Sequence, residues 1–172
     1  PPAGIPAKFV LLAGLGPKKD FHGGRVHRAA AVAGRLARRL KLARVMLIPP
    51  LPDDRSLLCP KYGTRQAILG FAHGSYRFDK FISGRRPYAG PETLDVLYLE
   101  RPSRTLAKMV RDAAVMQEIL AEVRDLANLP ANEAPPAAIA SHARAMARRH
   151  GVKFSVLDKR ALEKKRCHSL LA

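Results

Sequence analysis

The chain has 172 residues, of which 47% are hydrophobic, and its formal net charge is +17. The hydrophobic fraction excludes a wholly disordered chain, and no apolar run approaches the roughly 20 residues of a membrane-spanning helix. So large an excess of Lys and Arg destabilises a compact fold by self-repulsion unless an anionic partner screens it. Nucleic acid is the commonest such partner, and the alternative is a basic protein with a solvated charged surface.

Strands and helices alternate in the first hundred residues. A continuous apolar run predicts a buried parallel strand over Lys8–Leu15, which the turn Gly14–Gly16 ends. The alternation predicts an α/β domain over residues 1–100, with helices packed on a largely parallel sheet. Gly70 and Gly74 would let another backbone approach closely. The further predicted elements are a helix over Gly24–Leu42, a strand over Ala43–Ile48, a helix over Arg65–Phe81 and a strand over Thr93–Leu99.

A long helix, a Pro-rich joint and a short helix–strand–helix segment are predicted for the remainder. An apolar stripe at i, i+3, i+4, i+7 spacing predicts one helix over Arg101–Asn128. Glu133–Pro136 ends this register, because proline lacks an N–H and disfavours helix in the residue before it. The chain therefore divides into residues 1–100, a linking segment 101–134 and a remainder 135–172. The elements of that remainder are a helix over Pro136–His150, a strand over Val152–Leu157 and a helix over Lys159–Arg166.

Basic residues gather in two regions. Residues 1–50 contain ten Lys and Arg residues and one acid, Asp20, and residues 101–172 are again basic. In the helix over Gly24–Leu42 the arginines share one arc without an interleaved acid, and arginine binds phosphate bidentately. A membrane surface is the weaker alternative, because no predicted helix pairs a basic face with bulky aromatics. The predicted RNA-contacting residues are Lys18, Lys19, Arg25, Arg28, Arg35, Arg38, Arg39, Arg85, Arg86, Arg144, Arg148, Lys164, Lys165 and Arg166.

No pattern in the sequence indicates catalysis or metal binding. No two of the six histidines have the i, i+4 spacing of a helical zinc site, and no Cys-x-x-Cys or Gly-x-Ser-x-Gly occurs. Cys59 and Cys167 lie far apart and indicate ordinary thiols in a reducing compartment. We therefore predict no catalytic residue, no metal and no cofactor. A nucleotide resembling ADP-ribose at the Gly14–Gly16 turn is the weakest alternative, since no acidic ribose partner follows at the expected spacing.

Several motifs occur in a fixed order along the chain. Lys8–Gly16 is an apolar run ending in Gly-Leu-Gly, and Gly74–Phe81 reads Gly-Ser-Tyr-Arg-Phe-Asp-Lys-Phe. Arg124–Asn132 reads Arg-Asp-Leu-Ala-Asn-Leu-Pro-Ala-Asn and leads into a Pro-containing helix start, and Val152–Asp158 is followed by Leu162. In this order the segments resemble the leucyl aminopeptidase family. Arg166 and Cys167 depart from the family's Gly-Met-x-x-x-Leu-Ala segment.

The resemblance implies a macro-type N-terminal domain, a linking helix and the first part of a catalytic domain. In the family the two metals and the catalytic Lys and Arg come from segments further along, and no residue here matches them. A single strand at Val152–Leu157 cannot form a stable sheet alone. Neighbouring protein subunits or RNA are therefore expected to cover its edge, unless the strand joins the first sheet.

Two hypotheses follow. The first is a non-catalytic, leucyl-aminopeptidase-like pseudoenzyme that serves as a structural, rRNA-binding subunit of a mitochondrial ribosome in the matrix, with the cytoplasm as the other location. The alternative is the N-terminal part of a metal-dependent leucyl aminopeptidase whose catalytic half is elsewhere. The chain begins with Pro1-Pro2 rather than Met, as expected of a processed or incompletely represented chain.

Overall fold

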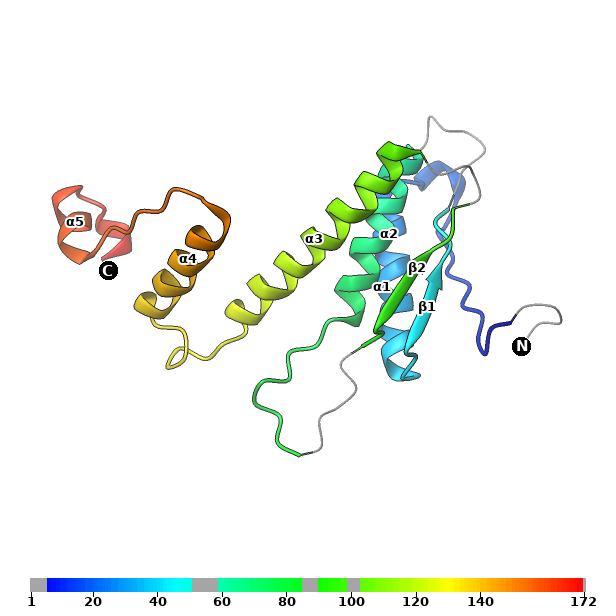
Figure 1. The fold of residues 1–172 in the computed structure, drawn as a ribbon, viewed down its shortest axis with the longest axis horizontal. Helices are drawn as coiled ribbons and strands as arrows, with labels where there is room; N and C mark the ends of the chain where they lie inside the picture. The colour runs from blue at the N-terminus through cyan, green and yellow to red at the C-terminus, as the bar shows by residue number, and fades with distance from the viewer. Residues whose placement is uncertain (1–5, 51–58, 85–89, 99–102, 172) are drawn as a thin grey trace. The chain divides into compact units, whose positions relative to one another are not determined.

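The computed structural model describes residues 6–50, 59–84, 90–98 and 103–171, and it contains two compact units, Pro1–Val123 and Arg124–Ala172 (Figure 1). The first unit combines helices with a small sheet, so the predicted α/β class is confirmed. The predicted domain boundaries at residues 100 and 134 stay a prediction. The elements of the first unit are the 3₁₀ turn η1 (Lys18–Asp20), α1 (Gly23–Arg39), β1 (Arg44–Leu47), α2 (Pro60–Ser75), β2 (Thr93–Val96) and most of α3 (Arg104–Ala127).

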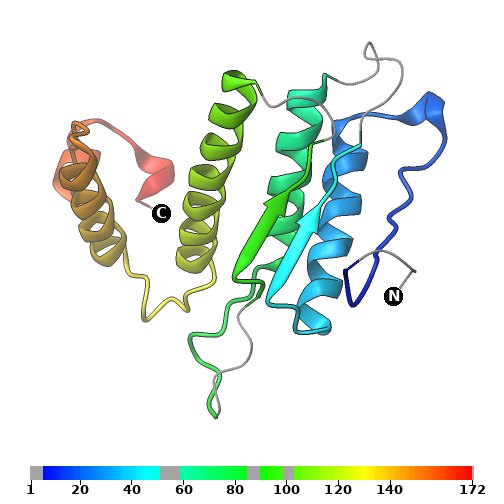
Figure 2. The same ribbon diagram turned by 45° about the vertical axis from the view of Figure 1, so that its right-hand side comes forward.

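The sheet of the first unit has two strands. β1 and β2 run parallel, with Arg44 opposite Thr93 and Leu47 opposite Val96. Figure 2 shows the strands side by side, with α1 and α2 behind them. Parallel strands require a crossover connection, and α2 supplies it between β1 and β2. The prediction of parallel pairing is thus confirmed for the two described strands.

Small residues let α1 and α2 pack backbone against backbone. Buried Val26, Ala30 and Ala37 of α1 form one hydrophobic cluster with Ala67 and Phe71 of α2. A methyl group on Gly70 would overlap the His27 carbonyl, and one on Gly74 would overlap the Ala31 carbonyl. The prediction that these two glycines permit close backbone approach is therefore confirmed. The partly buried side chains that pack against the cluster are Leu15, Phe21, Ala33, Leu42, Val45, Leu47 and Leu94.

The N-terminal half of α3 completes this unit. Ser103 Oγ accepts a hydrogen bond of 3.1 Å from the Leu106 N–H, which satisfies one of the donors left unpaired at a helix start. Leu106 and Ala113 are buried two turns apart. The C-terminal half is different, because it leaves large apolar side chains exposed to solvent. They are Val115, Met116, Ile119, Leu120 and Val123.

Two predicted strands are wrong. The segments Lys8–Leu15 and Val152–Leu157 contain no strand. Leu12 is 94% exposed, and residues 153–157 make no hydrogen bond with any described residue. An apolar or alternating pattern gives a strand only when a second strand supplies ladder hydrogen bonds, and the described residues offer neither segment such a partner.

The second unit contains α4 (Pro136–His150), α5 (Lys159–Lys164) and the 3₁₀ turn η2 (His168–Leu170). Gly151 ends α4 with φ of 65°, in the left-handed region that suits glycine, and its N–H binds the Ala147 carbonyl. Asp158 caps α5 by accepting a 2.8 Å hydrogen bond from the Ala161 N–H. The predicted bounds of α4 are confirmed. No helix in the described parts of either unit is both long and apolar enough to cross a membrane.

Candidate functional site

Three arginines form an exposed basic face on α1. Arg28, Arg35 and Arg39 are exposed, on the side of the helix opposite buried Val26 and Ala37. None of the three makes an ion pair or hydrogen bond with any residue that the structure describes. Their guanidinium groups are therefore available to an external anion, and we name them the arginine face.

The other two arginines of α1 have partners within the chain. The Arg25 guanidinium lies 3.6 Å from the Asp20 carboxylate. Arg38 Nη1 donates a 2.8 Å hydrogen bond to the Tyr76 carbonyl, at the C-cap of α2. A cation there interacts favourably with the negative end of the helix dipole. Sequence reasoning missed both roles, since helical spacing shows neither a partner before the helix, such as Asp20, nor one 38 residues away in the sequence.

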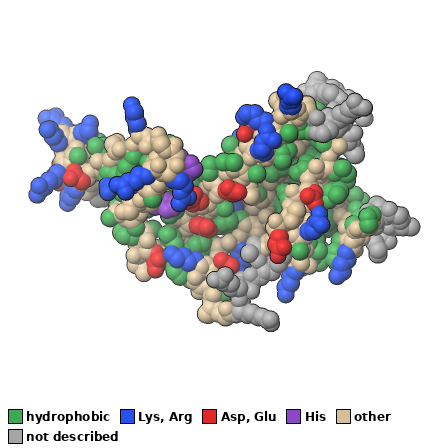
Figure 3. Space-filling model, viewed as in Figure 1, with side chains coloured by type: hydrophobic (Ala, Val, Ile, Leu, Met, Phe, Trp, Pro, Cys, Tyr) green, Lys and Arg blue, Asp and Glu red, His purple; other side chains and the backbone are tan. Residues whose placement is uncertain are grey.

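The remaining predicted RNA-contacting residues lie in several places. Lys18 and Lys19 are exposed in η1, whereas Arg85 and Arg86 fall outside the described residues. In the second unit Arg144 lies with its guanidinium 5.9 Å from the centroid of the Phe154 ring, a cation–π distance. Figure 3 shows Lys and Arg side chains over α4 and α5 and acidic side chains along α3. All five predicted residues of the second unit are exposed: Arg144, Arg148, Lys164, Lys165 and Arg166.

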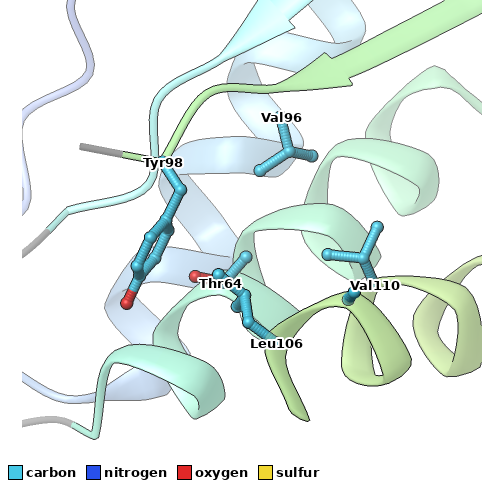
Figure 4. Close-up of a pocket in the computed structure, with 6 residues that line it drawn as sticks. Thr64, Val96, Tyr98, Leu106 and Val110 are labelled. Carbon is cyan, nitrogen blue, oxygen red and sulfur yellow. The ribbon is translucent and has the colours of Figure 1, made fainter. Parts of the chain in front are cut away.

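A small cavity of about 240 Å³ lies between α2, the end of β2 and the start of α3 (Figure 4). The Thr64 hydroxyl donates to the Pro60 carbonyl at 2.9 Å, so its proton is already used. The lining contains no carboxylate, imidazole, thiol or amine, and it offers apolar contact rather than acid–base chemistry. Sequence reasoning missed this cavity, which is lined by Thr64, Val96, Tyr98, Leu106, Ala107 and Val110.

Cys59 is an exposed thiol at the N-cap of α2. The backbone N–H groups of Tyr62 and Lys61 at the start of α2 lower the pKa of the thiol, and the charge of Lys61 lowers it further. The signal in the sequence was Cys59 directly before Pro60, since proline favours the first position of a helix.

Potential metal ligands do not cluster in the described structure. The rings of His27 and His73 meet edge to face, with centroids 5.5 Å apart. No group of three or more His, Cys, Asp or Glu side chains capable of holding a metal occurs among the described residues. These residues therefore do not fit the two-metal centre that a leucyl aminopeptidase requires, and we assign no hydrolytic step to them.

The N-terminal half of the sequence matches a known protein family. The model for the "cytosol aminopeptidase family, N-terminal domain" matches residues 1–84. Residues 1–84 belong to the N-terminal domain of this family. The resemblance inferred from the motifs is therefore confirmed.

Bacterial relatives extend the match beyond residue 84. A probable cytosol aminopeptidase of Syntrophotalea carbinolica is 33% identical over 173 residues, which cover 99% of this chain and 34% of the relative. A second, from Geotalea uraniireducens, is 28% identical over 170 residues, covering 98% of the chain and 34% of the relative. A third, from Azoarcus sp., is 32% identical over 176 residues, covering 99% and 34%. The chain thus spans about a third of the length of these cytosol aminopeptidases.

These relatives overturn the first hypothesis. They are bacterial proteins named as aminopeptidases, and none of the three is a ribosomal or mitochondrial protein. The predictions of a ribosomal subunit and of a mitochondrial location are wrong. The prediction of a degenerate, non-enzymatic relative is also wrong, because the matching relatives are named as aminopeptidases and so belong to an enzyme family. The net charge suggested an RNA-rich particle, but charge alone carries no information about ancestry or cellular location.

Proposed function

We propose that this chain is the N-terminal part of a metal-dependent leucyl aminopeptidase, whose metal ligands and catalytic residues are supplied by protein outside residues 1–172. The observation that carries the proposal is the match of nearly the whole chain to about a third of proteins named cytosol aminopeptidase. The described residues contain no metal-ligand cluster, in agreement with a catalytic centre formed by protein outside residues 1–172.

Exposed apolar surface in the first unit supports the proposal. Ile119 and Val123, on one face of α3, are 47% and 54% exposed, and Val115 precedes them by one turn. A contiguous exposed apolar row marks a surface that another protein segment covers. In the proposed aminopeptidase, this row packs against the catalytic part of the enzyme.

The segment 152–157 of the second unit supports it in a different way. Val152, Phe154 and Val156 alternate with other residues along an extended backbone, and all three are exposed. This is the pattern of a strand that lacks its ladder partner. In the proposal, a strand of the catalytic part pairs with it, in place of the separate protein subunits expected from the sequence.

Native protein from the source cells tests the proposal directly. An antibody raised against this chain would isolate the protein, and the isolate would be assayed for hydrolysis of leucine p-nitroanilide with added Mn²⁺ or Zn²⁺. We expect hydrolysis that EDTA abolishes and that metal restores. A native isolate that contains the chain but hydrolyses no leucine substrate would refute the proposal.

The 172-residue chain alone is the second arm of the test. We expect it to release no product under the same conditions, because the described residues contain no metal-ligand cluster. Metal-dependent hydrolysis by this chain alone would show that it holds its own catalytic centre. It would overturn the proposal that the catalytic residues lie outside residues 1–172.

A further inference from the structure

We propose that the arginine face of α1, formed by Arg28, Arg35 and Arg39, binds the phosphate backbone of RNA without reading its sequence. The comparisons assign no such activity to this chain, and the inference does not depend on the aminopeptidase proposal. It rests on the local charge, the spacing and the rigid support of these three side chains.

The first observation is that the arginine face lacks a counter-charge among the residues that the structure describes. Asp20 is the sole acid among the first 50 residues, and Arg25 already pairs with it at 3.6 Å. Helix α3 differs, because acids alternate with its basic residues. On α3, Lys108 pairs with Asp112 at 2.8 Å, and Glu118 and Glu122 follow along the same helix. The charge of the arginine face is therefore less compensated than that of α3, which is the helix used as the control below.

The spacing of the three side chains suits a polyanion. Arg28 and Arg35 are separated by two helical turns, and Arg39 lies one turn further along. At 1.5 Å per residue the three positions span about 16 Å on one side of the helix. A single bound ion would meet one guanidinium, whereas an extended chain of phosphates can meet all three, and each guanidinium can bind phosphate bidentately.

The arginine face is also held on a rigid support. The opposite side of α1 packs against α2 through Gly34, Gly70 and Gly74, where no larger side chain fits. Arg38 adds a hydrogen bond from α1 to the end of α2. Because α1 is fixed on its buried side, binding does not have to order the backbone that carries the arginines.

The chemistry of the face favours RNA over a membrane. Among these arginines, α1 exposes the apolar side chain of Val32, which is 52% accessible to solvent. A helix that lies in a membrane surface needs a broad face of bulky apolar and aromatic residues, which α1 buries or lacks. Phosphate contact alone produces sequence-independent binding that weakens steeply with salt.

A matched pair of double variants tests the proposal. Arg28→Glu/Arg35→Glu removes two arginines seven residues apart on α1, and Arg104→Glu/Arg111→Glu removes two exposed arginines at the same spacing on α3. The two variants change the net charge equally. Binding of the 172-residue chain to a fluorescein-labelled oligouridylate of about 20 nucleotides would be followed by anisotropy between about 50 and 200 mM KCl. Circular dichroism would establish that each variant keeps the wild-type helix content.

We expect the α1 variant to bind the oligonucleotide at least about tenfold more weakly, and the α3 variant to stay within about threefold of wild type. The slope of log affinity against log salt should fall by about 1.4 in the α1 variant, since each single-strand phosphate contact contributes about 0.7. Arg28→Gln/Arg35→Gln should show most of the same loss without introducing repulsion.

Three results would overturn the proposal. Equal losses in the two Glu variants would mean that binding follows net charge and not the arginine face. If the wild-type protein bound no oligonucleotide at any salt concentration, it would lack the proposed RNA-binding activity. Displacement of the oligonucleotide by an equal charge concentration of poly-glutamate would identify an acidic protein, rather than RNA, as the kind of partner.

Discussion

Gly74 of α2 lies directly against the carbonyl oxygen of Ala31 in α1, so closely that a methyl group at Gly74 would overlap that oxygen. Gly70, one turn earlier, meets the His27 carbonyl in the same way. The two helices therefore touch through their backbones over more than one turn. This contact fixes α1 in position, and with it the arginine face.

Substitution of Gly74 with Ala should lower the free energy of unfolding by about 2 kcal/mol. The added methyl forces the helices apart, at a cost typical of overpacking, which exceeds the gain of up to about 1 kcal/mol in helix propensity. Urea unfolding followed by circular dichroism measures the change. Gly14→Ala is the control, because nothing lies within 4 Å of its added methyl. A comparable loss of stability in that variant would show that the effect at Gly74 does not come from the helix contact.

Arg38 should contribute to stability, in contrast to the arginines of the exposed face. Arg38→Met removes the 2.8 Å hydrogen bond to the Tyr76 carbonyl and keeps much of the apolar stem. We expect a loss of about 1–2 kcal/mol in the free energy of unfolding, as for a partly exposed bond to a charged donor. Arg28→Met, which removes an exposed arginine, should change stability by less than about 0.5 kcal/mol. Equal effects of the two substitutions would contradict the assignment.

The helices could be predicted from the sequence because their signals are local. The Pro-rich joint and the glycine after the helix predicted α4 to the residue, from Pro136 to His150. Lys8–Leu15 and Val152–Leu157 carry equally clear strand patterns but form no strand in the described structure. A helix satisfies its own backbone, whereas a strand depends on a partner whose position no local pattern encodes.

The same distinction applies to the candidate site. Helical periodicity correctly placed Arg28, Arg35 and Arg39 on an exposed side of α1. It could not separate them from Arg25 and Arg38, whose partners are Asp20 and the Tyr76 carbonyl. Which arginines are engaged within the chain is decided by tertiary contacts, so the structure was needed to define the arginine face.

Cys59 should react with iodoacetamide at lower pH than an ordinary thiol. The N–H groups of Tyr62 and Lys61 stabilise the thiolate and lower the pKa of Cys59, so a larger thiolate fraction is present at neutral pH. The rate of alkylation of the Cys59 peptide, measured by mass spectrometry from pH 6 to 10, should therefore reach half its maximum at lower pH in the native chain than in urea.

The comparison with unfolded protein controls for the chemistry of the reagent. Urea removes the α2 N-terminus but leaves the Cys59-Pro60-Lys61 sequence intact, so any difference in midpoint reports the folded environment. Identical midpoints in native and unfolded protein would show that the helix N-terminus does not activate this thiol. Tyr62→Pro removes the N–H that lowers the pKa most, and it should raise the midpoint in the native protein.

The exposed apolar row on α3 yields opposite expectations for the isolated chain and for the complete enzyme. Ile119 is 47% exposed in the first unit, so Ile119→Lys should leave the stability of the 172-residue chain within about 0.5 kcal/mol and reduce its self-association in sedimentation velocity. In the proposed aminopeptidase the same side chain is buried against the catalytic part. There the substitution should cost about 2–3 kcal/mol, the order of burying one large aliphatic side chain, and should lower the thermal midpoint of the native enzyme.

Ala114→Lys introduces the same charge at an exposed small residue of α3 and should leave both proteins unchanged. If Ile119→Lys left the native enzyme as stable as Ala114→Lys does, this face of α3 would not be the surface that the catalytic part covers.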